Sequence, residues 1–197
     1  FPPYSPPAMA DHFLTGREDP LYWKGTDVLE RLGVTRHRAR CQAVDPAARR
    51  VTLSSGASLD YDRLVVTTGS RLHAELPGVD LDGVYDFKSL RTATSLVERA
   101  RRGEVTSAVI VGAGFIGVEV ALLLRDLGLD VTMVSRRWVM PRAVDPETGA
   151  VILAALQGRG VEVRMYQPAE AFEGDTGVEA VRLAGGKRLR ADVYVAA

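Results

Sequence analysis

Cysteine is nearly absent from this sequence, and neither sign of charge is in excess. Cys41 is the only cysteine among the 197 residues, so the chain holds no intrachain disulfide, no Cys-x-x-Cys redox pair and no cysteine zinc site. We expect the Cys41 thiol to be buried and inert, since a free cysteine behaves as a small hydrophobic residue. Lys and Arg together number 25, as do Asp and Glu. This balance does not favour a nucleic-acid partner, and we predict no metal site.

Long apolar runs are also lacking. The longest, residues 108–124, is interrupted by Glu119 and by glycines, and it falls short of the roughly 18 consecutive apolar residues that a membrane span needs. The first residues, FPPYSPPAMADHF, carry neither an initiator Met nor a signal-peptide pattern. We therefore expect an internal segment of a longer protein, with no membrane association and a cytoplasmic location.

The first part of the chain predicts loops and short antiparallel strands. Five of the ten prolines fall within the first twenty residues, which indicates a rigid loop leading into a short helix. Residues 36–44 alternate polar and apolar side chains, as a half-buried strand does. Residues 49–54 predict a second strand, residues 54–60 a turn, and Tyr61–Thr67 a third strand. Three short strands joined by turns indicate an antiparallel meander.

The later part of the chain predicts an α/β fold. Apolar residues recur at helical spacing over residues 90–102, and strands then alternate with helices. This alternation predicts a parallel sheet with right-handed crossovers. A hairpin turning at Gly185-Gly186 and a buried closing strand follow. The expected alternating elements are strand 107–111, helix 115–127, strand 131–135, helix 146–156 and strand 161–165.

A glycine-rich turn between the first strand and helix of this alternation matches G-x-G-x-x-G. In a dinucleotide site the first glycine permits a sharp turn, the second lets a pyrophosphate approach the backbone, and the third lets helix and strand pack closely. Free N–H groups at the helix start then hold the phosphate charge. The alternative is an ordinary glycine turn of an α/β protein. The predicted turn residues are Gly112, Ala113, Gly114, Phe115, Ile116 and Gly117.

The end of the next strand indicates which dinucleotide is bound. An NAD site usually has an acidic residue there, which hydrogen-bonds to the ribose. This chain has Ser135 followed by Arg136 and Arg137, and guanidinium groups suit a 2′-phosphate. The sequence therefore favours NADPH over NADH. The alternative is that both arginines are solvated and that Ser135 tolerates either cofactor. Trp138 is expected to be a packing residue, with a cover for the adenine ring as the alternative.

Three segments resemble the FAD-dependent pyridine nucleotide-disulfide oxidoreductases, flavoproteins with two dinucleotide-binding domains. They are LVVTTGS (residues 64–70), VIVGAGFIGVEVALLL (residues 109–124) and ADVYVAA (residues 191–197). The resemblance implies FAD and NADP or NAD as cofactors. It also implies that residues 1–104 are a partial FAD-binding domain without its first βαβ unit. Residues 105–197 would then be the NAD(P)-binding domain.

The resemblance implies roles for further residues. Thr67, Thr68 and Gly69 match the turn that runs past FAD. Phe115 matches the aromatic residue that shields the flavin until nicotinamide displaces it. Glu119 and Ala196 match positions beside the nicotinamide, although Glu119 also suits the start of a helix, where the macrodipole favours a carboxylate. We expect no side chain to be an essential acid or base in the hydride step.

The subfamily that fits best is that of the ferredoxin and rubredoxin reductases. It implies hydride transfer from NAD(P)H to flavin, and electron transfer onward to a small redox protein or a small molecule. One alternative is a non-catalytic NAD(P)-binding or sensing module. Another is a disulfide reductase whose redox cysteines lie upstream. We expect the 197-residue chain to be inactive alone, and a homodimer is one option for its assembly.

Overall fold

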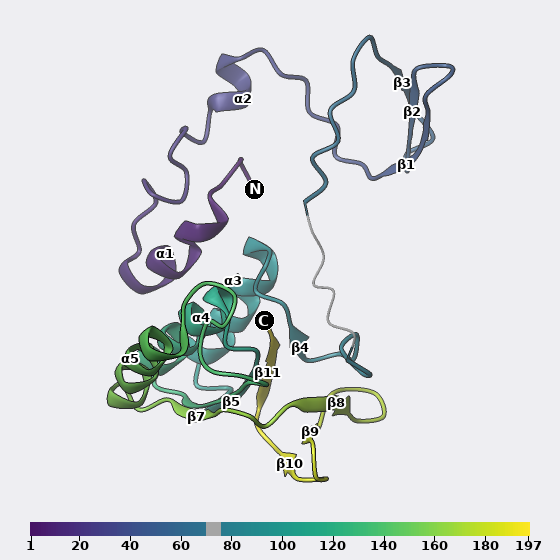
Figure 1. Ribbon diagram of the computed structural model, residues 1–197. Helices are drawn as coiled ribbons and strands as arrows, with labels where there is room; N and C mark the ends of the chain where they lie inside the picture. Colours follow the sequence, from purple (N-terminus) through teal and green to yellow (C-terminus); the bar gives the residue numbers. More distant parts are fainter. Residues whose placement is uncertain (70–75) are drawn as a thin grey trace. The chain divides into compact units, whose positions relative to one another are not determined.

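The computed structural model describes residues 1–69 and 76–197, and these form two compact units (Figure 1). The smaller unit contains Phe1–Pro3 and the chain from Lys24 to Gly69, the limit of the described residues there. The larger unit contains Tyr4–Trp23 and the chain from residue 76 to Ala197. The two units are described separately below.

A five-stranded sheet forms the centre of the larger unit (Figure 1), and every neighbouring pair of its strands is parallel. The predicted α/β class is therefore confirmed. β5 and β6 run side by side in register, from Ser107 opposite Asp130 to Val111 opposite Val134. The strand order is β4 (Val84–Tyr85), β11 (Val193–Ala196), β5 (Ser107–Val111), β6 (Asp130–Val134) and β7 (Glu162–Arg164).

Helices cover one face of this sheet. α3 (Leu90–Arg101), α4 (Phe115–Asp126) and α5 (Pro146–Gly158) all contribute side chains to the larger core cluster. Sequence-local caps set where two of them begin. The Ser89 hydroxyl accepts a hydrogen bond from Thr92 N–H at 3.2 Å at the start of α3, and Asp145 accepts one from Thr148 N–H at 2.7 Å at the start of α5.

The opposite face is covered by a small antiparallel sheet. This sheet has the order β10 (Arg188–Leu189), β9 (Ala180–Leu183) and β8 (Ala169–Glu173). Its buried Phe172 and Val181 form a second core cluster with Val109 and Tyr194 of the parallel sheet. The hairpin between β9 and β10 turns at Gly185-Gly186, as predicted. β8 was not predicted, because its five residues offer only a brief alternation of side chains.

The first helical segment packs within the larger unit. η1 (Pro6–Ala8) and α1 (Met9–Thr15) place Met9 and Phe13 in the same core cluster as α3 and α4. Tyr4 Oη accepts a hydrogen bond from Leu90 N–H at 3.0 Å. Packing therefore joins residues 4–23 to α3 and α4, which lie far away along the chain. The assignment of residues 1–104 to an FAD domain stays a prediction.

The smaller unit contains the predicted antiparallel meander, with its third strand elsewhere. α2 (Val28–Arg31) precedes β1 (Cys41–Asp45), β2 (Arg50–Leu53) and β3 (Ser58–Asp60), which pair in that order. The prediction of a third strand at Tyr61–Thr67 is wrong. The observed third strand, β3, lies within residues 54–60, where a turn was expected. Gly56, with φ +83°, allows a tighter turn, so that Ser58 reaches Thr52.

Two expectations for this unit are wrong. Val65 and Val66 are 79% and 70% exposed, and no strand of the described residues pairs with them. An apolar run becomes a strand only where a neighbour accepts its backbone hydrogen bonds. Cys41, expected to be buried, is exposed on β1, an edge strand of the meander.

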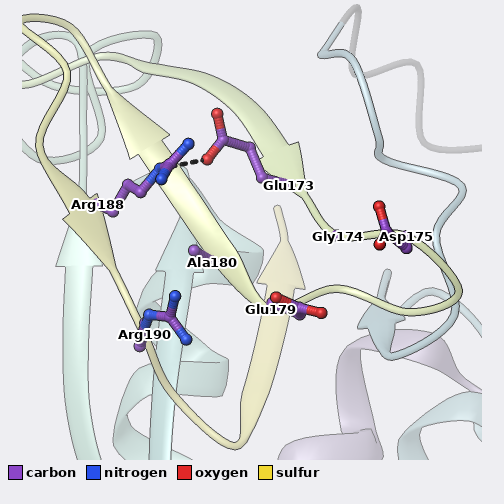
Figure 2. Close-up of a pocket in the computed structure, with 7 residues that line it drawn as sticks. All are labelled: Glu173, Gly174, Asp175, Glu179, Ala180, Arg188 and Arg190. Atoms are coloured by element: carbon purple, nitrogen blue, oxygen red, sulfur yellow. Dashed lines mark ion pairs between the residues drawn. The ribbon is translucent and has the colours of Figure 1, made fainter.

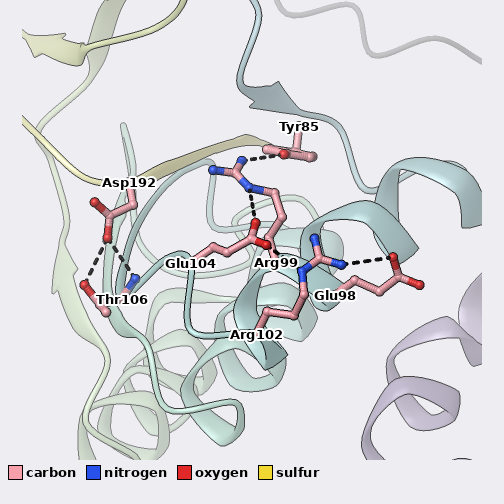
Figure 3. A network of polar contacts seen from close by, with 7 residues as sticks. All are labelled: Tyr85, Glu98, Arg99, Arg102, Glu104, Thr106 and Asp192. Atoms are coloured by element: carbon pink, nitrogen blue, oxygen red, sulfur yellow. Dashed lines mark hydrogen bonds and ion pairs between the residues drawn. The ribbon is translucent and has the colours of Figure 1, made fainter.

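The larger unit is tied together by polar contacts at the start of its central strands. Asp192, just before β11, accepts hydrogen bonds from the backbone N–H and the hydroxyl of Thr106 at 2.8 and 3.0 Å (Figure 3). It also accepts hydrogen bonds from the backbone N–H and the hydroxyl of Ser107, both at 3.0 Å. In the same view Arg99 of α3 donates to Tyr85 Oη of β4 at 2.8 Å.

Among residues 1–69 and 76–197, none of the helices has the length and apolar character that a membrane span requires.

Replacing Asp192 by asparagine is expected to destabilise the chain in a pH-dependent manner. The backbone N–H of Thr106, followed by the two hydroxyls, lowers the pKa of the Asp192 carboxyl below its ordinary value. The ionised form then stabilises the fold fully above the unfolded pKa of about 3.9, and this stabilisation is lost as the pH falls through the lower folded pKa. Because the carboxylate is exposed, we expect the Asp192→Asn variant to lose only about 1 kcal/mol at pH 7.

Urea unfolding of both proteins at pH 7 and at pH 3 measures this effect. The difference between Asp192 and its asparagine variant should shrink at the lower pH. A difference that stays constant between the two pH values would show that the charge of Asp192 is irrelevant to stability.

Candidate dinucleotide-binding site

The glycine turn lies between β5 and α4, at the carboxyl edge of the parallel sheet. Gly112 has φ +116°, and a Cβ atom there would lie 2.1 Å from the carbonyl oxygen of Ala197. A Cβ atom on Gly117 would lie 2.2 Å from the carbonyl oxygen of Gly112. Both positions therefore need glycine because other backbone approaches closely. Gly114 differs, since a Cβ there would meet nothing within 4 Å.

The open space at Gly114 lies at the start of α4, where no side chain caps the helix. Gly114 is the N-cap residue of α4, and it offers no side-chain acceptor to the first N–H groups. The first turn of α4 also contains no acidic residue. Unsatisfied N–H groups and the helix macrodipole attract an anion at such an end. The residues present thus fit a phosphate group, which a side chain at Gly114 would obstruct.

Phe115 and Glu119 share one side of α4 because they stand four residues apart. The Phe115 ring is 66% exposed, and Ile116 beside it is half-buried. Partial burial raises the pKa of the Glu119 carboxyl above its ordinary value. Ala196 pairs with Val111, the last residue of β5 before the glycine turn. These predicted site residues therefore occupy the same edge of the sheet as Gly112.

A second group of site residues follows β6. Ser135 is buried, and its hydroxyl accepts a hydrogen bond from Arg137 N–H at 3.3 Å. The side chains of Arg136 and Arg137 are exposed, and neither forms an ion pair with any described residue. The loop is joined to the glycine turn by Met140 N–H, which donates to Ala113 C=O at 2.7 Å.

The same loop contains a further exposed arginine that sequence reasoning missed. Arg142 likewise forms no ion pair with a described residue. The signal that places Arg142 with the site is structural: the hydrogen bond from Met140 N–H to Ala113 C=O joins this loop to the glycine turn. Trp138 has a packing role, since its Nε1 donates to Val144 C=O at 3.1 Å and its ring lies against Gly149.

Three other predicted positions belong to the smaller unit. Thr67, Thr68 and Gly69 belong to the smaller unit, where they form no helix or strand, and Gly69 has φ +74°. The cofactor role of these three residues stays a prediction. No group of three His, Cys, Asp or Glu residues in the described chain could hold a metal ion.

A pocket on the small antiparallel sheet shares no residue with the glycine turn. Its volume is about 210 Å³, and Figure 2 shows charged side chains around it. Arg188 of β10 and Glu173 of β8 form an ion pair at 2.7 Å. One positive and one negative side chain of the pocket therefore neutralise each other. Its lining residues are Glu173, Gly174, Asp175, Glu179, Ala180, Arg188 and Arg190.

A parallel sheet with this glycine turn, at the start of a helix, defines a dinucleotide-binding domain. Residues 3–197 match the family described as pyridine nucleotide-disulphide oxidoreductase, and the chain belongs to this family. The family predicted from three sequence segments is therefore confirmed.

Known relatives include electron-transfer reductases. The ferredoxin–NAD(+) reductase component of the biphenyl dioxygenase system of Paraburkholderia xenovorans (strain LB400) is 37% identical over 158 residues, which are 79% of this chain and 38% of that protein. The crystal structure of a ferredoxin reductase from Rhodopseudomonas palustris matches with a TM-score of 0.85 and 27% identity, over 100% of this chain and 49% of that one. The chain thus spans less than half the length of these relatives.

A second similar structure is that of an NADPH oxidase engineered from the water-forming NADH oxidase of Lactobacillus brevis. It matches with a TM-score of 0.82 and 26% identity, over 98% of this chain and 45% of that one. It was solved with NADPH bound, and five substitutions separate it from the natural oxidase.

Proposed function

We propose that this chain is the NADPH-binding part, with an incomplete FAD-binding part, of a flavoprotein reductase that passes electrons to an external acceptor. The observation that carries the proposal is the open space at Gly114, which meets the uncapped start of α4. The pyrophosphate would lie there, held by N–H groups of the first helical turn. Nicotinamide and flavin supply hydride transfer when both are bound, while the protein orients and shields them.

Residues of the chain then have distinct tasks. Phe115, exposed at the helix start, would shield the flavin face, and Glu119 would lie on the same side of α4. Thr67, Thr68 and Gly69 would run past FAD. Ala196, at the end of β11, would border the nicotinamide with its small side chain. None of these tasks requires a side chain to carry a proton in the hydride step.

The preference for NADPH rests on arginines after β6. Arg136, Arg137 and Arg142 are exposed, and an arginine presents paired donors to a phosphate group. Among its five substitutions, the engineered NADPH oxidase loses an aspartate and gains arginines one and seven positions after it. In this chain Arg136 and Arg142 follow Ser135 at the same two spacings. This agreement supports a 2′-phosphate site formed by the loop.

The Arg136→Ala variant is expected to lose NADPH affinity selectively. Removing a charge-assisted hydrogen bond to a phosphate costs about 1.5–3 kcal/mol, so NADPH affinity should fall by roughly 10- to 100-fold. NADH has no 2′-phosphate, and its affinity should not change. Calorimetric titration with both dinucleotides measures the two affinities.

The matched control is Arg91→Ala, since Arg91 is an exposed arginine on α3. This variant should bind both dinucleotides as the unaltered chain does. Equal losses for NADPH and NADH in Arg136→Ala, or no loss at all, would contradict the 2′-phosphate site.

The acceptor is proposed to be a small redox protein. Two of the similar proteins are ferredoxin reductases by name, and Cys41 is the only cysteine of this chain. Stoichiometric FAD in the whole protein, with electron transfer to a ferredoxin that survives Cys41→Ser, tests this proposal. Absence of flavin would favour a non-catalytic binding module. A strict dependence on cysteines elsewhere in the whole protein would favour a disulfide reductase.

A further inference from the structure

Tyr166, the second residue after β7, has an unusual backbone conformation. Its φ is +58°, in the left-handed region that bulky side chains rarely adopt. Such a residue persists only where its surroundings impose it, and these residues gather at ligand sites. The non-glycine residues with positive φ among the described residues are Arg49, Phe87, Met140 and Tyr166.

Local structure explains the conformation of the other three. Phe87 and Met140 are only 5% and 8% exposed, so the packing of their side chains offsets the strain. Arg49 lies in the tight turn between β1 and β2. The side chain of Tyr166 is 64% exposed, and packing therefore offsets little of its strain. Like Arg49, Tyr166 lies in a turn, the one that follows β7, and this turn leaves the tyrosine side chain accessible to a ligand.

The backbone holds Tyr166 beside the loop of the arginines. Ser135 N–H donates to Arg164 C=O at 3.0 Å, and Gln167 N–H donates to Ser135 C=O at 3.0 Å. These two bonds bind Ser135 to the residues on either side of the segment 165–166. The backbone of this exposed tyrosine is thus anchored near Ser135, the residue that precedes Arg136 and Arg137.

We propose that Tyr166 is the stacking surface for the adenine ring of the bound dinucleotide. The inference rests on the proposed function, because it assumes pyrophosphate at Gly114 and the adenosine ribose at Ser135. β7, which Tyr166 follows, pairs with β6, so a base attached to a ribose at the end of β6 would have Tyr166 within reach. A tyrosine offers a flat aromatic face at a low cost in side-chain entropy. Trp138 packs against Gly149 and donates to Val144 C=O, so we assign the adenine ring to Tyr166 instead.

The Tyr166→Ala variant should weaken every adenine-containing ligand by the same factor. Loss of one base–aromatic stack lowers affinity by about 10-fold or more. NADPH, NADH and ADP-ribose should all be affected, whereas reduced nicotinamide mononucleotide, which has no adenine, should bind unchanged. The Tyr166→Phe variant keeps the aromatic face and should bind all four ligands as the unaltered chain does. Calorimetric titration of the 197-residue chain measures these affinities.

The Tyr166→Gly variant separates stacking from folding. Glycine adopts positive φ without strain, so the urea midpoint of unfolding should rise while adenine affinity falls. Unchanged affinities in the alanine and glycine variants, with Arg136→Ala still selective against NADPH, would overturn the stacking role and leave the proposed function standing. Binding of neither dinucleotide by the unaltered, folded chain would overturn both.

Discussion

Replacing Gly114 by aspartate is expected to abolish dinucleotide binding while leaving the chain folded. A like charge about 4 Å from a phosphate costs about 4 kcal/mol at an effective dielectric constant of about 20, which corresponds to a loss of several hundred-fold in affinity. The fold has room for the side chain, because a Cβ at Gly114 meets nothing within 4 Å.

The same substitution should not lower stability. Gly114 is the N-cap residue of α4, with φ −82° and ψ −170°, and aspartate favours this position. Its charge is also placed favourably near the start of the helix macrodipole, a gain of about 0.3–1 kcal/mol. Calorimetry with NADPH and urea unfolding should therefore change in opposite directions.

The control for this experiment is Gly114→Asn, which caps the helix without adding a charge. Its affinity for NADPH should lie between those of the unaltered chain and Gly114→Asp. If the aspartate variant bound NADPH normally in a folded state, the pyrophosphate could not lie at this helix start, and the proposed site would be wrong.

The Gly112→Ala variant is expected to lose at least about 3 kcal/mol of the free energy of unfolding, through backbone strain together with a steric clash. Its φ of +116° is unfavourable for alanine, and the added Cβ would lie 2.1 Å from the carbonyl oxygen of Ala197. Neither β5 nor β11 can move alone, because Val111 and Ala196 pair within the sheet. Urea unfolding measures the loss.

Gly128→Ala isolates the contribution of strain. Gly128 has φ +91°, but a Cβ there would meet nothing within 4 Å. Its alanine variant should lose only about 1–2 kcal/mol, the cost of the left-handed conformation. Equal losses at Gly112 and Gly128 would contradict the close approach of the chain end to the glycine turn.

Local sequence patterns were sufficient to predict an element when all the residues that determine it are close together along the chain. The turn from Gly112 to Gly117 was predicted because strand, glycines and helix are contiguous. α3 was predicted almost to the residue, since the apolar spacing that indicates it is local. The third strand of the meander was misplaced, because strand position depends on which neighbour offers hydrogen bonds. Thr52 pairs with Ser58, and the more apolar run at Val65 has no partner in the described chain.

The sequence by itself determined the α/β class, the glycine turn and the family, because each depends on residues close together along the chain. Only the tertiary structure distinguished Gly114, which faces open space, from Gly112 and Gly117, which other backbone approaches. It also joined Ser135 to the segment that holds Tyr166, about 30 residues later. Contacts of this kind depend on the order of strands in the sheet, and the periodicity of side chains along the sequence does not predict that order.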